Sequence, residues 1–412
     1  MGRDRLNRSL LLGACLAACT AAQAQDLQWS GFGTISSYRG DDAEAAVRPH
    51  ERVKNASQKG QGRWDGDTVL GAQLRWQFQQ SLELVGQVQV RDDLVNGFRP
   101  STEWAYLGWR PSPHWSVRLG RQPLPVFLHS ETLRVGYALT PVRPMAAVYG
   151  FSGSEPVDGI NASLSNQAWG GTLSLDLGTG QNRVTLPRGQ VDTQAFVASA
   201  LRWQKEGLSL RLGLAAYRFS LKDPALQTQL DGLSQAGSLC GNCSQVLPER
   251  ARTQGVEGQL INLGLIWEHG DWTLSAEAMK RGGSSVFAAE LYGWYALLSH
   301  RFGTLMPYVS VGNSRNKEAA LGLQAKLGLP AGVQQSLDQL DRSLHRPWGR
   351  RIELAGLRWD WHEQAALKVQ YERWTGSGDK STPRNGEIQL KPGHPPWDGR
   401  VSLLSVSLDF VF

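Results

Sequence analysis

Residues 400–412 read Arg400-Val-Ser-Leu-Leu-Ser-Val-Ser-Leu-Asp-Phe-Val-Phe412. From Ser402 onward, apolar side chains alternate with mostly small or polar ones, which is the two-residue period of a β-strand. The apolar face ends in Phe410 and Phe412. A strand with lipid on one side and water on the other has this pattern, but so does a half-buried edge strand. This stretch alone favours the edge strand. The pattern of the rest of the chain is needed to distinguish an edge strand from a membrane strand.

The whole chain has 412 residues, 46 glycines and 16 tryptophans, with a mean hydropathy of -0.34. Beyond the N-terminus, no apolar run reaches the roughly 18 residues that a spanning helix needs. Spanning strands stay possible, because their two alternating faces average to a mildly polar composition. Glycine favours turns and strands here, and tryptophan is favoured where an amphipathic ring meets both apolar and polar surroundings.

Strand-like stretches alternate with connections along the chain. Sixteen of them lie near 27–38, 68–79, 82–91, 102–110, 115–121, 157–166, 171–178, 191–204, 208–220, 256–268, 272–281, 289–303, 306–314, 350–362, 366–373 and 400–412. Seven short links alternate with eight long links, and the long ones run near 39–67, 92–101, 122–156, 179–190, 221–255, 282–288, 315–349 and 374–399.

This alternation of link lengths places every short turn at one end of the strands and every long loop at the other. A soluble β-sandwich has no reason to separate its connections in this way. The sequence therefore predicts an all-β fold: one transmembrane antiparallel β-barrel of about 16 strands over residues 25–412, with short periplasmic turns and long extracellular loops.

The tryptophans support this interpretation independently. Nine of the 16 lie within a few residues of a short link: Trp76, Trp109, Trp115, Trp169, Trp203, Trp267, Trp272, Trp359 and Trp361. A ring of indoles at one level is typical of a membrane interface. Tryptophans that pack soluble hairpins would not gather at the short turns alone.

Residues 1–24 have the parts of a secretory signal peptide. Three arginines precede an apolar stretch at 10–18, and Ala22-Gln23-Ala24 is a small-residue cleavage site. The overlapping Leu16-Ala17-Ala18-Cys19 resembles a lipoprotein box, which would leave Cys19 lipidated. We expect cleavage after Ala24, because a closed barrel needs no lipid anchor. Cleavage lowers the formal charge from +6 to +4, a surplus too small to predict nucleic-acid binding.

The face of the strands opposite the apolar one carries charges of both signs. We expect the pore to be lined by Arg75, Arg118, Arg202, Arg211, Arg358 and Lys368, and by Glu83, Asp176, Glu277, Asp360, Glu372 and Asp409. Mixed charges with a slight basic excess predict a hydrated path with a transverse field. For each arginine, structural hydrogen bonding inside the barrel is an equal alternative to contact with a solute.

Two long links have unusual compositions. Residues 122–156 are rich in proline and apolar side chains, so we expect this link to fold inside the barrel as a pore-constricting loop. Four side chains would then stand near the narrowest point: His129, Glu131, Arg134 and Arg143. In the link 315–349, the spacing of Val333, Leu337, Leu340 and Leu344 predicts an amphipathic helix that serves as a loop cap or a partner contact.

Cys240 and Cys243 belong to a Cys-Gly-Asn-Cys sequence in the long link 221–255. In an exported protein, we expect them to form a disulfide within the loop. A redox motif would need a thioredoxin-like context, and a metal site would need two further ligands.

The motifs of known chemistry are incomplete. Gly376-Ser-Gly-Asp-Lys-Ser-Thr382 resembles a phosphate-binding loop, but Asp379 replaces the glycine before the lysine. His362-Glu363 lacks the second histidine of a zinc protease. We expect no enzyme activity, no cofactor and no metal.

Several short pieces resemble the porins of the Gram-negative outer membrane: Ser30-Gly-Phe-Gly-Thr34, Val117-Arg-Leu-Gly-Arg121, Arg134-Val-Gly-Tyr137, Val142-Arg-Pro144, Val148-Tyr-Gly150, Ala366-Leu-Lys-Val-Gln-Tyr371 and residues 404–412. The resemblance implies a sixteen-stranded barrel, commonly a homotrimer, with the third long loop folded into the pore. It also implies surrounding outer-membrane lipid and lipopolysaccharide, and an assembly signal at Phe412 that the barrel-assembly machinery reads. The loop lacks an acidic Pro-Glu-Phe-Gly type of motif, so selectivity is not carried over.

The sequence thus predicts an outer-membrane porin, a passive diffusion channel for small hydrophilic solutes with a mild preference for anions. Two alternatives stay open. One is a substrate-specific uptake channel with a saturable binding site, and the other is a surface enzyme embedded in a barrel.

Overall fold

The computed structural model describes residues 26–50, 53–92, 95, 97–150, 155–235, 237–317, 321–344, 348–378, 384–385, 388–390 and 398–412. The expected signal peptide at 1–24, with its alternative of lipidation at Cys19, lies outside the described residues.

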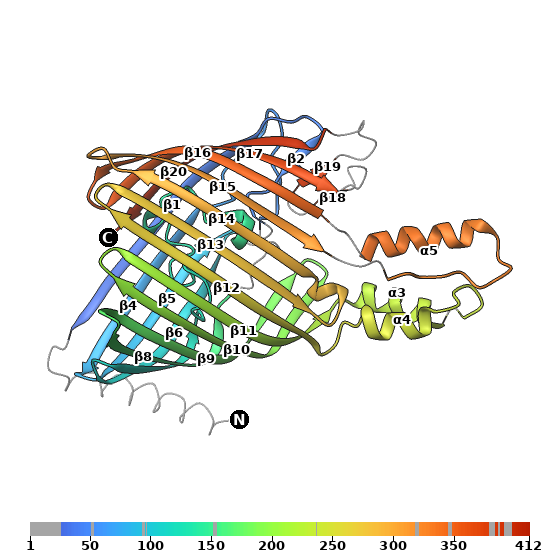
Figure 1. Cartoon of the computed structure of the whole chain (residues 1–412), viewed down its shortest axis with the longest axis horizontal. Helices are drawn as coiled ribbons and strands as arrows, with labels where there is room; N and C mark the ends of the chain where they lie inside the picture. Colours follow the sequence, from blue (N-terminus) through green and yellow to red (C-terminus); the bar gives the residue numbers. More distant parts are fainter. Residues whose placement is uncertain are drawn as a thin grey trace, which may run out of the picture.

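Sixteen long antiparallel strands form one closed sheet in the described part of the chain (Figure 1). They are β1 (Leu27–Gly40), β4 (Val69–Gln79), β5 (Leu82–Arg91), β6 (Arg99–Ser112), β7 (Trp115–Gln122), β8 (Val157–Ala168), β9 (Gly171–Leu186), β10 (Gly189–Lys205), β11 (Leu208–Lys222), β12 (Val256–His269), β13 (Trp272–Gly283), β14 (Glu290–His300), β15 (Leu305–Lys317), β16 (Trp348–His362), β17 (Ala365–Gly378) and β20 (Arg400–Val411). Each pairs with its neighbour in the chain, and the two-residue strand β3 (Gly62–Arg63) pairs with β1. The predicted barrel of sixteen strands is confirmed.

The stretch at 400–412 closes the barrel. β20 pairs with β17 on one side and with β1 on the other, in a register that runs from Phe32 opposite Val411 to Gly40 opposite Leu403. Ser405, Ser407 and Asp409 are 0% exposed. Leu404 and Val406, at the alternate positions, are exposed. The two faces of the alternation therefore point into and out of the barrel, which removes the open edge that a terminal strand would otherwise have.

The outside of the barrel carries many exposed apolar side chains, including Leu119, Leu263 and Val309. Seven of the tryptophans near the short turns are also exposed: Trp109, Trp115, Trp169, Trp267, Trp272, Trp359 and Trp361. So many exposed apolar side chains on the outside of a barrel are rare on a protein surrounded by water and suit contact with lipid.

One predicted long link is wrong. Residues 179–190 form no loop, because β9 extends to Leu186 and β10 begins at Gly189, with Val191 opposite Val184 in the extension. The sequence Gly178-Thr-Gly180 looks like the start of a turn. In the sheet these glycines instead make room for other side chains: the space beside Gly178 is filled by Leu124 and that beside Gly180 by Val157.

The other long links carry small elements of their own. β2 (Ala45–Val47), β18 (Arg384–Asn385) and β19 (Ile388–Leu390) form a three-stranded sheet. The helices α3 (Pro224–Gln235), α4 (Cys243–Arg250) and α5 (Ala331–Leu344) extend beyond one end of the barrel (Figure 1). Apolar residues of these helices and of the segments beside them form a separate cluster: Leu230, Cys240, Cys243, Leu247, Ala251, Leu321, Leu323 and Leu337. Among the described residues, no helix is both long and apolar enough to cross a membrane.

Helix α5 occupies most of the region where the sequence predicts an amphipathic helix. Leu337 is buried in the cluster that joins α5 to α3 and α4, and Val333 is half-buried. The side chains of Leu340 and Leu344 lie outside the described residues. The helix therefore packs against a neighbouring loop, as a loop cap would; the partner contact that the sequence also allows stays a prediction.

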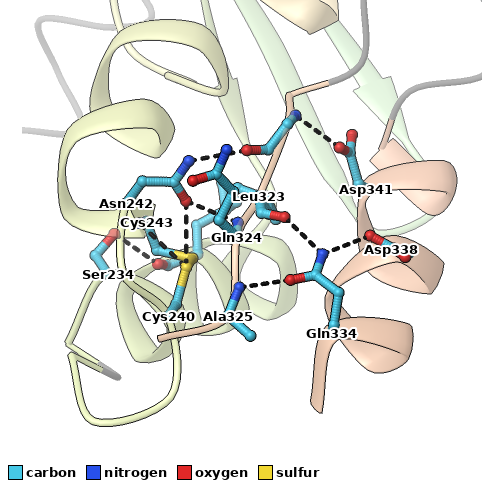
Figure 2. The surroundings of a disulfide bond; sticks show 12 residues. Ser234, Cys240, Asn242, Cys243, Leu323, Gln324, Ala325, Gln334, Asp338 and Asp341 are labelled. Carbon is cyan, nitrogen blue, oxygen red and sulfur yellow. Dashed lines mark hydrogen bonds between the residues drawn. A yellow bond between two sulfur atoms is a disulfide. The ribbon is translucent and has the colours of Figure 1, made fainter. Parts of the chain in front are cut away.

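The structure joins Cys240 and Cys243 by a disulfide with a Cα–Cα distance of 5.6 Å (Figure 2). Between the two cysteines, the Asn242 side chain donates to the carbonyl of Gly322 (2.8 Å) and accepts from the amide of Gln324 (2.9 Å). The disulfide thus holds the turn through which the link 221–255 contacts the link 315–349.

Candidate pore

The loop at residues 122–156, called the inward loop below, is described except at 151–154. It contains a 3-10 helix, η2 (Gly136–Ala138), and one short helical turn, α2 (Ala146–Tyr149). Its apolar side chains are buried with inward residues of six of the seven strands from β10 to β16, in a cluster that includes Leu124, Val126, Phe127, Met145, Val148, Tyr149, Ala198, Ala215, Met279, Leu291, Tyr295, Leu297, Tyr308 and Leu354. It also contacts β1, β17 and β20. Because strands from opposite sides contact it, the loop crosses the interior.

Glycines on the inner wall make this close approach possible. A Cβ atom at Gly264 would lie 2.6 Å from the side chain of Leu128, and one at Gly213 would collide with the carbonyl of Val126. Ala147 approaches Gly293 in the same way from the far end of the loop. Any larger residue at these positions would push the loop away from the wall.

A buried carboxylate holds the loop on the β13 wall. Glu277, 2% exposed, accepts hydrogen bonds from the amide of Leu128 (2.9 Å) and the hydroxyls of Tyr149 (2.6 Å) and Tyr295 (3.2 Å). Two loop groups and one wall group thus satisfy the carboxylate, as a buried charge requires.

Lys368 holds the loop on the β17 wall. Its Nζ donates to the carbonyls of Gly136 (2.7 Å), Leu139 (2.7 Å) and Pro141 (3.1 Å), and lies 3.0 Å from the Asp409 carboxylate. Arg358 donates to the carbonyl of Leu139 as well (2.9 Å). An irregular, proline-containing segment has carbonyl groups without a ladder partner, and these cationic side chains supply the missing donors.

Arg143 belongs to the same network. The guanidinium is 4% exposed and forms ion pairs with Asp67 (2.8 Å) and with Glu372, and it donates to the hydroxyl of Ser405 (2.7 Å). The side chain of Glu372 is almost as deeply buried, at 3% exposed. Arg143 therefore links the loop to β17, β20 and the segment before β4.

Two cavities lie beside the loop. The larger has a volume of about 720 Å³ and reaches the short turn between β10 and β11. Its charged lining comprises Arg118, Arg202, Lys205, Arg211, Glu131, Asp176, Glu206 and Glu268, with four basic and four acidic side chains. The smaller, of about 100 Å³, lies toward the long loops and is bordered by Asp67, Arg134, Arg143 and Glu155.

No protein-family model and no curated protein match the chain. Solved structures do. An anion-selective porin from Comamonas acidovorans superposes with a TM-score of 0.53 at 14% identity, over 94% of this chain and 100% of that one. OmpF from Salmonella typhi, in complex with daunomycin, gives 0.54 at 11% identity, over 94% and 98%. The outer-membrane channel DcaP of Acinetobacter baumannii gives 0.54 at 10% identity, over 94% and 97%. The chain has the porin fold.

In this porin fold, the expected lining residues divide into three groups. Arg118, Arg202, Arg211 and Asp176 border the larger cavity. Arg75 pairs with Glu83 (2.7 Å between Nε and Oε2), and Asp360 pairs with Arg301 (2.8 Å) and Arg358 (2.6 Å).

The remaining expected lining residues require a correction. Arg358, Lys368, Glu277, Glu372 and Asp409 do point inward, but all five are buried, behind or against the inward loop. Alternation along a strand predicts the direction of a side chain, whereas the path of the loop decides whether water reaches it.

The four expected constriction residues also differ from one another. Glu131 is exposed and pairs with Arg118 (2.8 Å). Arg134 is mostly buried and pairs with Glu155 (3.0 Å). The His129 ring lies against Tyr149, with 5.8 Å between ring centroids. Burial, and then the charge of Arg211, lowers the pKa of His129 to about 4, so the ring is neutral near pH 7. Arg143 is buried and borders only the smaller cavity, so its expected place at the narrowest point of the pore is wrong.

Sequence reasoning missed other residues that position the loop. Arg350 donates to the carbonyl of Ala146 (2.7 Å), and Gln370 accepts from the amide of Val142 (3.0 Å). Arg350 is on the same inward face of β16 as Arg358, and Gln370 is on the same inward face of β17 as Lys368. The alternation along these strands could therefore have identified both residues. Asp67 and Tyr149 lie in connections, where no periodicity marks them.

Proposed function

We propose that the protein is an outer-membrane porin, a passive diffusion channel for small hydrophilic solutes. The cavity of about 720 Å³, lined by charged and hydroxyl side chains inside the closed barrel, carries this proposal. A polar lumen beside an inward segment limits solutes by size and charge. The apolar outer surface and the exposed tryptophans support a place in a membrane.

The inward loop would act as the constriction, with Glu131 as its water-exposed charge. A mild preference for anions is part of the proposal. It rests on Arg202 and Arg211, which form no ion pair with any carboxylate in the described part of the chain, whereas Arg118 is neutralised by Glu131.

Bilayer conductance tests the function. Folded protein, checked by the altered gel migration of unboiled samples, is inserted into planar bilayers in potassium chloride. We expect discrete steps of current that grow linearly with voltage. Folded protein that inserts but carries no current would contradict the proposal.

The assembly partners belong to the proposal too. Surrounding lipopolysaccharide and a homotrimer follow from the porin fold as hypotheses, and cross-linking in outer-membrane vesicles would detect the trimer. Phe412 pairs through its backbone with Gly31 (2.8 and 3.0 Å) and its side chain is exposed. An aromatic ring in this position is available to the barrel-assembly machinery. We expect Phe412→Ala to lower the amount of folded barrel in the membrane while conductance per channel stays unchanged.

A further inference from the structure

Two arginines stand side by side on the wall of the larger cavity. Arg202 on β10 and Arg211 on β11 are directly opposite each other in the antiparallel register, and both border the cavity. On its other side, Arg202 is opposite Ser174 of β9. The pair therefore forms a compact basic surface at the short-turn side of the inward loop.

Among the described residues, no carboxylate lies within ion-pair distance of either arginine, and Asp176 and Glu277 attract Arg211 only at longer range. Glu131 is engaged by Arg118 (2.8 Å), and Asp176 accepts a hydrogen bond from the Ser163 hydroxyl. Like charges directly opposite each other on neighbouring strands repel, so the arrangement is unfavourable on its own.

The inward loop fixes one member of the pair. Arg211 is 6% exposed and donates from one terminal nitrogen to the carbonyl of Pro125. Arg202 is less buried and has no such contact among the described residues. One guanidinium is thus held in place, and the other faces the cavity beside the hydroxyls of Ser174 and Ser209.

We propose that the pair is a saturable binding site for small oxyanions, that is, for solutes bearing a phosphate or a carboxylate group. The planar fork of a guanidinium donates two parallel hydrogen bonds to such groups. An oxyanion between the two forks removes their repulsion, and the serine hydroxyls supply further donors. This site rests on the proposed channel function and makes the channel favour oxyanions over chloride in occupancy.

Competition between anions tests the site. Current carried by chloride through the reconstituted protein is measured while inorganic phosphate is added, and acetate is tested in a parallel series. We expect each oxyanion to reduce the chloride current along a saturating curve. Arg202→Gln should raise the half-inhibiting phosphate concentration about tenfold, the effect of losing one charge-assisted pair.

Arg75→Gln is the matched control, because it removes the same charge from an arginine that already pairs with Glu83. The half-inhibiting concentration should stay near that of the wild type in this variant. Equal shifts in both variants would mean that the general field of the lumen, rather than a site, attracts the anion, and would overturn the proposal. A chloride current that phosphate leaves unchanged would overturn it as well.

Isothermal titration of the folded protein in detergent with inorganic phosphate distinguishes failure of the binding site from failure of the channel function. If the protein carries no current but binds phosphate, and Arg202→Gln weakens this binding, then the oxyanion site is supported and the channel function is rejected. Normal chloride current without measurable phosphate binding would reject the site and retain the channel.

Discussion

Two halves of the inner wall carry similar charged side chains in different surroundings. On β17 and β20, Lys368 and Asp409 are 0% exposed and contact the inward loop or each other. On β7 and β10, Arg118 and Arg202 border a cavity of about 720 Å³. The difference arises because the loop covers the first half and leaves part of the second open. A charge inside this barrel is therefore a support for the loop or a contact for solutes, according to where the loop runs.

The covered half explains how a proline-rich segment can be stable inside a barrel. Three basic residues of the covered wall donate to loop carbonyls: Arg350, Arg358 and Lys368. Arg211, at the border of the larger cavity, donates to a fourth. Regular secondary structure would pair these carbonyls within the loop. Since the loop is irregular, the wall has to pair them, and each pairing fixes the loop at one more point.

Lys368→Met should have the largest effect on the contacts between the inward loop and the covered half of the wall. It removes the donor of three loop carbonyls and leaves the Asp409 carboxylate buried without its cation. Loss of one partner of a buried pair costs about 3–5 kcal/mol. We expect a lower unfolding temperature and larger, noisier current steps as the loop leaves the wall.

Arg75→Gln serves as the comparison, because its ion pair with Glu83 is more exposed. Surface pairs of this kind contribute about 0–1 kcal/mol, so its unfolding temperature should hardly change. Equal effects of the two substitutions would show that the loop does not depend on Lys368.

Gly264→Leu tests the shape of the wall rather than its charge. The new side chain would occupy the space of Leu128, which already lies 2.6 Å from the position of a Cβ atom. Overpacking of this kind typically costs about 1–3 kcal/mol. We expect altered conductance with a smaller loss of stability than in Lys368→Met. The double variant Gly264→Leu/Leu128→Ala should move the current back toward the wild-type value, and a current that stays at the Gly264→Leu value would contradict direct contact as the cause.

The two halves of the wall also show which structural features the sequence predicts and which it does not. Alternation in segments such as 400–412 predicts the strands, the closure and the inward direction of Lys368 and Arg202 alike. Nothing in that alternation distinguishes the two, because burial of Lys368 depends on where residues 136–141 lie. The sequence also misplaces Arg143, since its partners Asp67 and Glu372 are 76 and 229 residues away. Likewise, glycines at 178 and 180 indicate a turn locally, but their role is to admit Leu124 and Val157.

The pH dependence of stability should reflect the buried part of the loop. Burial and Arg211 lower the pKa of His129 to about 4 in the folded protein, whereas an exposed imidazole has a pKa near 6.5. Between these values the unfolded chain binds more protons, so stability is complete above about pH 6.5 and falls as the pH drops toward 4. In His129→Gln, the decrease in unfolding temperature between pH 7 and pH 4 should be smaller. The same decrease in both proteins would exclude His129 as the cause, and leave His50, whose pKa burial also lowers to about 4.

Glu131→Gln should have the smallest effect on stability and act on the open half alone. Glu131 is exposed, so loss of its pair with Arg118 changes stability by at most about 1 kcal/mol. The freed guanidinium then adds positive charge to the cavity that Arg202 also borders, and the reversal potential in a salt gradient should move toward that of chloride. Arg143→Gln is the opposite case, because Arg143 is buried between Asp67 and Glu372. It should lower the unfolding temperature through the buried carboxylates that it leaves unpaired, with little effect on ion preference while the loop stays in place. A larger shift in selectivity from Arg143→Gln than from Glu131→Gln would mean that solutes pass along the covered wall, and would reverse the assignment of the two halves.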